Sequence, residues 1–313
     1  MMLIKPKFWD KKIGFISILL IPLSLTFLFL IFLKKKFTKT RMFKIPIICV
    51  GNIYVGGTGK TPVSVVLANE FSKLGKEPVI LRKYYENHKD EYNLIKNSFK
   101  NLIVNKSRID ALKELEKSNY DFVILDDGLQ DYKIKKNLKI VCFNQNQLIG
   151  NGLVLPAGPL RENLSTLKEA NIVIINGKKD KNFEDKILEI NKKLEIFYSS
   201  YKPTNINQFK NKKLMAIAGI GNPENFFQLI EENNLQITKK LIYPDHYKFS
   251  KNEIQNIINE AENKNWQIIM TEKDYFKIKD YKINKINYLK VMLVIDNKEK
   301  LISKIKELYD KNN

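Results

Sequence analysis

The 313-residue sequence has few of the side chains that build metal clusters or covalent cross-links. It contains two cysteines, Cys49 and Cys142, and two histidines, His88 and His246. Both cysteines lie in apolar runs typical of buried strands, so we expect reduced thiols rather than a disulfide. With so few His and Cys residues, a zinc cluster of the His/Cys type is not expected.

Acidic residues are also scarce relative to basic ones. The chain has 34 Asp and Glu against 54 Lys and Arg, which gives a formal net charge of +20. This excess predicts attraction to polyanions, which include nucleic acid, anionic lipid and phosphorylated substrates. The lysines are spread along the whole chain and no nucleic-acid-binding motif accompanies them, so we expect no nucleic-acid partner.

One long stretch lacks charge altogether. No charged residue occurs from Ile13 to Leu33. At about 1.5 Å per residue, a helix of this length spans roughly 30 Å, one hydrocarbon thickness. Basic residues flank it on both sides and the larger cluster follows it, which predicts that the rest of the chain is cytoplasmic. The run contains Pro22, and both a helix that spans the bilayer and one that lies in the interface fit it.

The clearest chemical signal is a glycine-rich turn between an apolar run and a helix start. The turn reads Gly56-Gly-Thr-Gly-Lys-Thr61, and Tyr54 stands where the usual pattern has its first glycine. Glycines let backbone N–H groups face an anion, and the helix N-terminus adds positive partial charge. A glycine-rich hairpin is the alternative, which the helical pattern after the turn disfavours. We predict an ATP site formed by Gly56, Gly57, Thr58, Gly59, Lys60 and Thr61.

Short apolar runs alternate with helical stretches from Ile45 to about Tyr198. This alternation predicts an α/β fold, a P-loop NTPase-like and mainly parallel sheet with helices on both faces. The expected strands are Ile45–Val50, Val79–Leu81, Leu102–Val104, Phe122–Leu125, Leu138–Phe143 and Ile172–Ile175, and the expected helices include Ile109–Leu115 and Leu164–Ala170.

Two carboxylates, Asp126 and Asp127, follow the apolar run that ends at Leu125. Ligands of parallel sheets bind at the C-terminal ends of the strands, where the phosphate loop also lies. We therefore predict that Asp126 and Asp127, with the hydroxyl of Thr61, hold Mg²⁺. A plain strand-to-turn Asp-Gly is the alternative interpretation.

The sequence predicts three parts. These are a membrane-anchoring helix in residues 1–36, a P-loop domain in residues 37–200 and a smaller α/β domain in residues 201–313. The polar stretch from Tyr198 to Lys213 is predicted to be a linker. In the last part we expect strands at Leu214–Ala218, Gln267–Met270 and Val291–Ile295, and a closing helix from Lys298 to Tyr309.

Several motifs in order together resemble the tetraacyldisaccharide 4′-kinase family of lipid A biosynthesis. They are Lys7-Phe8-Trp9, the loop from Val50 to Pro62, Leu125 to Gln130, Gly150 to Glu162, Ala218 to Pro223, Pro244 to His246, and Thr271 to Asp274. The resemblance runs nearly end to end. It implies an inner-membrane enzyme with cytoplasmic catalytic domains, and it leaves the oligomeric state unspecified.

The resemblance also implies a reaction and roles for residues. The γ-phosphoryl group of ATP would pass to the 4′-hydroxyl of tetraacyldisaccharide 1-phosphate and give lipid IVA. This acceptor is an acylated glucosamine disaccharide phosphate that lies among the membrane lipids. Asp90 would be the catalytic base, with His246 as its partner across the domain cleft. Lys60 would stabilise the transferring phosphoryl group, and Arg108 and Arg161 would contact phosphate or sugar.

The sequence departs from the family pattern near the proposed base. Lys83 and Tyr85 replace two glycines, Tyr92 replaces a proline, and Asp131 replaces a histidine. Two alternatives share the ATP site. One is a membrane-anchored kinase for another glycolipid, which differs in its acceptor pocket. The other is a switch ATPase, which hydrolyses ATP and phosphorylates no lipid.

Overall fold

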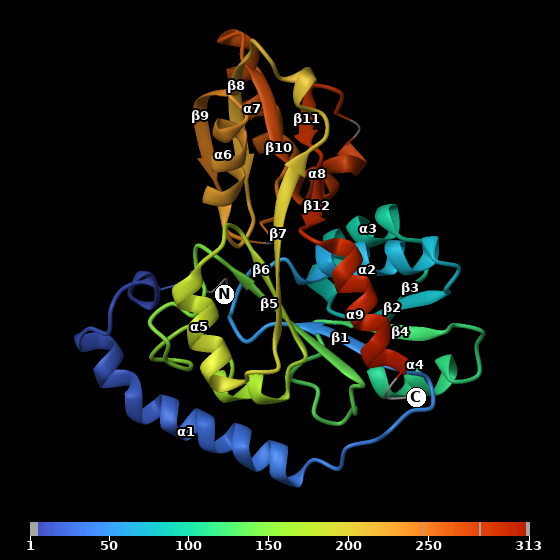
Figure 1. Ribbon diagram of the computed structural model, residues 1–313. Helices are drawn as coiled ribbons and strands as arrows, with labels where there is room; N and C mark the ends of the chain where they lie inside the picture. Colours follow the sequence, from blue (N-terminus) through green and yellow to red (C-terminus); the bar gives the residue numbers. More distant parts are fainter. Residues whose placement is uncertain (1–5, 246, 282, 311–313) are drawn as a thin grey trace. The chain divides into compact units, whose positions relative to one another are not determined.

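The computed structural model describes residues 6–245, 247–281 and 283–310, which form two compact units (Figure 1). The larger unit holds the described residues of 5–84, 99–200 and 295–313, and the smaller unit holds those of 85–98 and 201–294. The predicted division after residue 200 differs from these units in two segments. Residues 85–98 join the smaller unit because their helix packs on a helix there, and the closing helix packs on the larger unit.

The larger sheet has eight strands in the order β12-β7-β6-β5-β1-β4-β2-β3. Strands β1 to β6 lie wholly in the larger unit, whereas residues 201–203 of β7 and 291–294 of β12 are grouped with the smaller unit. Strands β1 to β7 pair in parallel, which confirms the predicted mainly parallel sheet. The strands are β1 (Ile47–Gly51), β2 (Pro78–Lys83), β3 (Leu102–Asn105), β4 (Phe122–Asp126), β5 (Leu138–Asn144), β6 (Ile172–Asn176), β7 (Glu195–Pro203) and β12 (Val291–Ile295).

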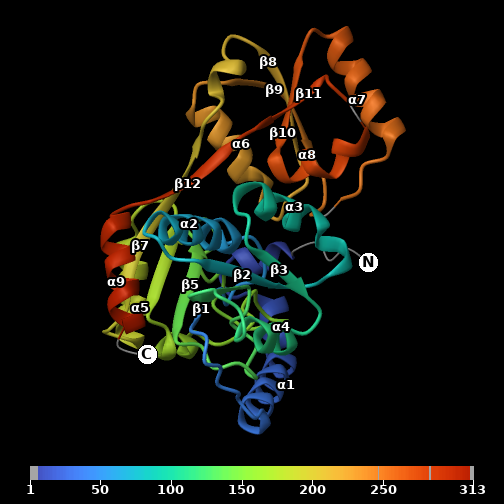
Figure 2. The ribbon, with the colours of Figure 1, turned by 90° about the vertical axis from the view of Figure 1, so that its right-hand side faces the viewer.

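Helices cover both faces of this sheet (Figure 2). Successive strand residues point to opposite faces, and Ile47 and Cys49 belong to the same core as residues of α4 and α5. On the other face, the ring of Phe122 lies 5.0 Å from Phe71 of α2 and 5.8 Å from Tyr309 of α9. The helices are α1 (Phe15–Phe37), α2 (Lys60–Lys73), α4 (Arg108–Leu115), α5 (Lys181–Ile190) and α9 (Lys298–Asp310), with 3₁₀ turns η1 (Lys7–Asp10) and η3 (Leu164–Glu169).

The smaller unit has a parallel sheet in the order β11-β10-β8-β9. Helix α6 packs on one face of this sheet, and α7 and α8 pack on the other. Its elements are β8 (Lys213–Ala218), β9 (Gln236–Ile242), β10 (Gln267–Thr271), β11 (Ile286–Leu289), α3 (Lys89–Ser98), α6 (Pro223–Glu232), α7 (Lys251–Asn263), α8 (Glu272–Ile278), and the 3₁₀ turns η2 (Glu86–His88), η4 (Ile206–Gln208) and η5 (Lys279–Tyr281).

Some sequence-based assignments were wrong. The predicted linker from Tyr198 to Lys213 contains the second half of β7 and the turn η4. Strand β7 pairs with β6 as far as Ser199, and on its other side it neighbours β12 in the sheet. The predicted helix Leu164–Ala170 is a 3₁₀ turn. The strand Val291–Ile295 is present, but it joins the larger sheet as β12.

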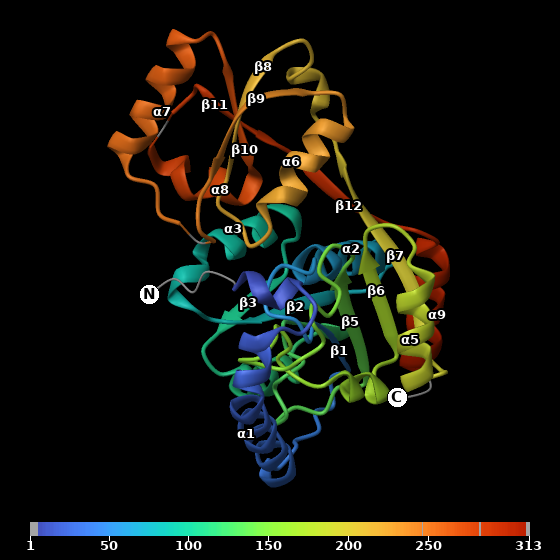
Figure 3. The same ribbon diagram turned by 90° about the vertical axis from the view of Figure 1, so that its left-hand side faces the viewer.

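Helix α1 contains the predicted uncharged run and is long and apolar enough to cross a membrane. Its buried residues are two serines. Ser24 Oγ donates to Val154 O at 2.8 Å and accepts from Ala157 N at 3.0 Å. Asn151 Nδ2 lies 3.2 Å from Ser17 Oγ. One polar edge of α1 therefore packs on the loop that follows β5 (Figure 3), while large apolar side chains elsewhere on the helix are exposed, among them Phe15, Leu19, Leu23, Phe29 and Phe32.

The same loop has no space for a side chain at Gly158. A Cβ atom built there would lie 2.3 Å from Leu153 O and 2.7 Å from its carbonyl carbon. We expect Gly158→Ala to lower the free energy of unfolding by about 1–3 kcal/mol, because backbone rather than a flexible side chain must move. Gly57→Ala is the matched control, since nothing lies within 4 Å of a Cβ there. Thermal unfolding measures both, and equal melting temperatures would contradict the steric argument.

Candidate functional site

The phosphate loop joins β1 to α2. Gly59 caps α2 in the left-handed region, with φ of 86°, which glycine adopts without steric cost. Helix α2 begins at Lys60, and the N–H groups of a first helical turn have no acceptor within the helix. Pro62 lies in this first turn. Its missing N–H group costs no helical hydrogen bond there, because an N–H group at that position would have no partner within the helix. The loop therefore presents backbone donors and a helix N-terminus, a combination that binds anions.

Side chains outside the loop fix its shape. Asn52 Nδ2 donates to Tyr54 O at 2.8 Å and to Gly56 O at 3.2 Å, and Gln130 Nε2 donates to Asn52 O at 2.9 Å. The buried Tyr54, which replaces the first glycine of the usual pattern, places its hydroxyl 3.2 Å from Asp10 Oδ1. Tyr54 is accommodated because its side chain packs into the core.

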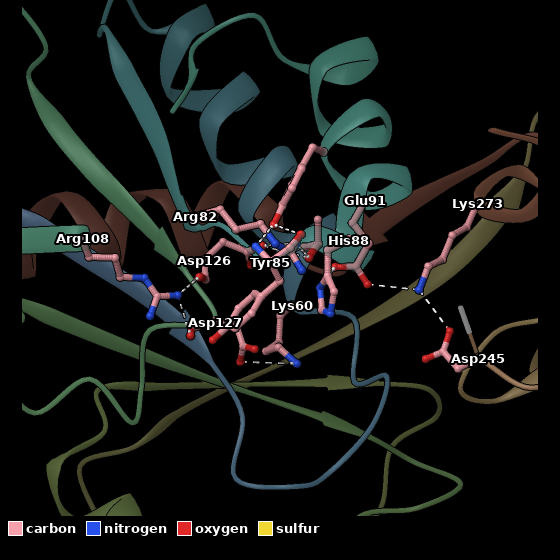
Figure 4. Close-up of polar contacts among 12 residues, drawn as sticks. Lys60, Arg82, Tyr85, His88, Glu91, Arg108, Asp126, Asp127, Asp245 and Lys273 are labelled. Atoms are coloured by element: carbon pink, nitrogen blue, oxygen red, sulfur yellow. Dashed lines mark hydrogen bonds and ion pairs between the residues drawn. The ribbon is translucent and has the colours of Figure 1, made fainter. Parts of the chain in front are cut away.

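Asp126 lies fully buried at the end of β4 and is surrounded by hydrogen-bond donors (Figure 4). Thr61 Oγ1 donates to Oδ2 at 2.9 Å and Ser64 Oγ donates to Oδ1 at 3.1 Å. Arg82 Nη1 donates to Asp126 Oδ2 at 2.7 Å and to Thr61 Oγ1 at 2.8 Å. Hydroxyl and carboxylate oxygens are the ligands that Mg²⁺ prefers. Thr61 and Asp126 therefore fit a metal ion whose other ligands are phosphates and water.

Asp127 is the next residue, in the left-handed region with φ of 52°. Its Oδ1 lies 3.7 Å from Lys60 Nζ and 3.3 Å from Arg161 Nη1. Burial would raise the pKa of Asp127, but the neighbouring cations outweigh it and hold the pKa below its ordinary value. Burial also lowers the pKa of Lys60, and Asp127 opposes that shift. Two cations thus converge on an ionised carboxylate beside the phosphate loop.

Arg108 supports the turn that carries these carboxylates. It starts α4, is buried, and donates from Nη2 to the main-chain oxygens of Asp126 and Asp127 at 2.9 Å each. Its Nη1 lies 3.6 Å from Asp131 Oδ2. Its expected contact with phosphate or sugar stays a prediction, as does that of Arg161.

The proposed base is part of the smaller unit. Asp90 lies in the first turn of α3, and His246 lies outside the described residues. The resemblance implies that the two face each other across the domain cleft, and this arrangement stays a prediction. Residues 85–98, which include α3, belong to the same unit as Asp245 and Tyr247, the neighbours of His246.

Sequence reasoning assigned no role to two buried residues of the site, Arg82 and Ser64. Arg82 follows four apolar residues near the end of β2 and pairs in register with Asp126 on β4. Ser64 follows Thr61 by three residues, so both hydroxyls lie on one helix face. The sequence signal that could have identified Arg82 is an arginine directly after the apolar run of a buried strand.

Other metal or thiol chemistry is not assembled in the part of the chain that the structure describes. Among those residues, no group of three or more His, Cys, Asp or Glu side chains could hold a metal ion. Cys49 and Cys142 are buried free thiols. Burial raises the pKa of Cys49 to about 11 and that of Cys142 to about 12.

Comparisons with known proteins agree on one family. Residues 16–310 match the family model described as tetraacyldisaccharide-1-P 4′-kinase. The chain is 41% identical over 317 residues to a tetraacyldisaccharide 4′-kinase of Pelagibacter ubique, which covers 100% of both proteins. It is 34% identical over 327 residues to a protein of the same name from Francisella tularensis subsp. novicida, covering 93% of this chain and 99% of that protein.

A solved structure shares the fold. The "apo" form of LpxK from Aquifex aeolicus in complex with ATP superposes with a TM-score of 0.70 at 22% identity, covering 93% of this chain and 99% of that chain. This likeness confirms the predicted fold class.

The Arg82–Asp126 pair offers a test of the geometry. Because both side chains are buried, removing one leaves the other charge uncompensated, and we expect Arg82→Gln and Asp126→Asn each to lower the free energy of unfolding by about 3–5 kcal/mol. The double variant should lose less than the sum. Urea unfolding followed by circular dichroism measures this coupling.

The exposed pair Lys113–Asp110 serves as the matched control. Lys113→Gln should cause little measurable loss, because exposed ion pairs are screened by water. Strictly additive losses at Arg82 and Asp126 would argue against a direct buried pair.

Proposed function

The chain belongs to the tetraacyldisaccharide-1-P 4′-kinase family, and on that premise we propose that it phosphorylates the 4′-hydroxyl of tetraacyldisaccharide 1-phosphate, with ATP as the donor and Mg²⁺ as the metal. The observation that carries the proposal is the convergence of Lys60, Thr61, Asp126 and Asp127 at the C-terminal ends of β1 and β4. This is the edge at which parallel sheets bind ligands.

Each residue has a distinct task in this reaction. The loop N–H groups and Lys60 bind the ATP phosphates, and Asp127 holds Lys60 and Arg161 in place. Thr61 and Asp126 would hold Mg²⁺, which neutralises charge on the phosphate oxygens when bound. Phosphoryl transfer depends mainly on such positioning and charge stabilisation.

The acceptor side needs a base. We assign this role to Asp90, with His246 orienting it. The 4′-hydroxyl oxygen bonds to the γ-phosphorus, the bond from that phosphorus to the bridging oxygen breaks, and ADP leaves. Asp90 takes the hydroxyl proton.

We further propose that α1 lies along the membrane interface and that the catalytic units are cytoplasmic. The contacts of α1 with the larger unit extend from Ser17 to Lys35, whose Nζ lies 2.5 Å from Glu162 Oε2. At about 1.5 Å per residue these positions are roughly 27 Å apart along the axis. A spanning α1 would carry the polar loop that it contacts into the hydrocarbon, where irregular backbone is not tolerated next to lipid. An interface position exposes the apolar side chains to lipid and leaves the lysines near anionic head groups.

The kinase proposal is tested with detergent-solubilised protein, Mg²⁺, γ-labelled ATP and tetraacyldisaccharide 1-phosphate. We expect label in a lipid product. Lys60→Ala should reduce transfer by about 100-fold or more, since a preorganised charge at the transferring group is lost.

Lys113→Ala is the control, because Lys113 lies on the exposed face of α4 and pairs only with Asp110 among the ion pairs of the described residues. ATP hydrolysis without labelled lipid would contradict the proposal and favour a switch ATPase. If a different glycolipid is labelled and tetraacyldisaccharide 1-phosphate is not, the proposed acceptor is wrong and the assignment of the ATP site still stands.

The position of α1 is tested with single cysteines at exposed sites before and after it, Lys12→Cys and Lys39→Cys. Oriented membrane vesicles are treated with a membrane-impermeant maleimide. We expect both positions to be labelled from the cytoplasmic side, since an interface helix keeps both ends on one side. The native thiols do not interfere, because Cys49 and Cys142 are buried. Labelling of position 12 only from the opposite side would show that α1 spans the bilayer.

A further inference from the structure

The motif Thr271-Glu-Lys-Asp274 has no role in the proposed reaction described above. It lies at the C-terminal end of β10 and the start of α8, and ligands of parallel sheets often bind at such ends. Thr271 caps α8, and its Oγ1 donates to Asp274 Oδ2 at 2.7 Å. Asp274 is fully buried and also accepts from Gly219 N at 2.7 Å and from Lys277 Nζ at 2.6 Å. Asp274 therefore fixes the first turn of α8, and Lys273 projects from a rigid base.

Lys273 joins two segments that are far apart in the sequence. Its Nζ lies 3.1 Å from Glu91 Oε1 on α3 and 3.1 Å from Asp245 Oδ1 in the turn after β9 (Figure 4). The side chain is 16% exposed. All three residues belong to the smaller unit. Charge-assisted contacts of a partly buried ammonium are stronger than those of an exposed one. The contacts of Lys273 with Glu91 and Asp245 therefore stabilise the arrangement of these two segments.

The two carboxylates are the chain neighbours of the two residues assigned to the acceptor side. Glu91 directly follows Asp90, and Asp245 directly precedes His246. Glu91 Oε2 is also 3.4 Å from His88 Nδ1, within the same segment. One ammonium therefore links the segment that follows Asp90 to the residue that precedes His246 in the sequence.

We propose that Lys273 is a positioning residue, which ties the first turn of α3 to the turn at residues 243–247 so that Asp90 and His246 act as one pair. This inference rests on the proposed function. Without the ammonium, Glu91 and Asp245 lose their shared cation, and like charges that remain close repel each other. The two segments then separate, and the base loses its alignment with the hydroxyl proton.

An internal contact of the α3 segment supports the same view. The Tyr92 hydroxyl accepts from Tyr85 N at 2.5 Å and donates to Tyr85 O at 3.0 Å, and Tyr92 is buried. These are two of the positions at which the sequence departs from the family pattern. The two hydrogen bonds of Tyr92 close residues 85–92 into a loop. This chain thus stiffens the segment from within by Tyr92 and fixes it to α8 by Lys273.

The test compares Lys273→Met with Lys273→Arg in the full-length enzyme. For Lys273→Met we expect kcat to fall about 10- to 100-fold, because small misplacement of a reacting group is costly, while KM for ATP changes less than about twofold. Lys273→Arg keeps the cation and should recover most of kcat.

Lys285→Met is the matched control, because Lys285 pairs with Glu262 on the exposed surface of the same unit. It should leave kcat unchanged. Lys273→Met is also combined with Asp90→Asn. If Lys273 acts through Asp90, the double variant loses less than the product of the single losses.

Each outcome decides the proposal. A wild-type kcat in Lys273→Met would overturn the positioning role, while lipid labelling by the wild type would uphold the kinase. A multiplicative loss in the double variant would assign Lys273 a role apart from Asp90 and overturn it as well. If Lys273→Met does not fold, Lys273→Gln replaces it with the same readouts. Absence of labelled lipid with the wild type rejects the kinase, and the positioning role with it.

Discussion

The buried carboxylate of Asp126 is the constraint on which the larger unit depends. An ionised group removed from water must be fully compensated. Here the compensation comes from Thr61 and Ser64 on α2 and from Arg82 on β2. Arg108 of α4 binds the main-chain oxygen of the same residue. One carboxylate thereby ties the start of α2, and with it the phosphate loop, to the centre of the sheet, so the need to satisfy a buried charge and the need to hold phosphates are met by the same contacts.

The two units divide the proposed chemistry between them. The phosphate loop and both carboxylates belong to the larger unit, whereas α3 and the neighbours of His246 belong to the smaller one. The chain leaves the larger sheet after β2, adds α3 to the smaller unit and returns at β3. Because α3 and the neighbours of His246 belong to one unit, the two segments are linked by contacts formed within that unit, such as those of Lys273 with Glu91 and Asp245.

Short sequence patterns predicted the features whose conformation depends on a few neighbouring residues. The phosphate loop, the start of α2 and strands β2 to β6 follow from glycine positions and apolar runs within a few residues. The second half of β7 was taken for a linker because its composition is polar, whereas its strand conformation depends on its neighbour β12, which lies far along the chain. Arg82 and Ser64 were missed for a similar reason. Their importance depends on their contacts with Asp126, which is far away in the sequence and is brought close by the register of β2 against β4 and by the packing of α2 on β4. The roles of individual site residues stay predictions, since those depend on the bound substrates.

The serine edge of α1 has a consequence for the order in which the protein is made. The partners of Ser24 lie about 130 residues further along the chain. During translation α1 therefore leaves the ribosome well before the loop that covers its polar edge has been synthesised. In that interval the helix has no protein surface to pack on, and its apolar side chains favour a lipid surface over water. The nascent chain would thus be held at the membrane first, and the sheet would fold afterwards at the place where its acceptor is found.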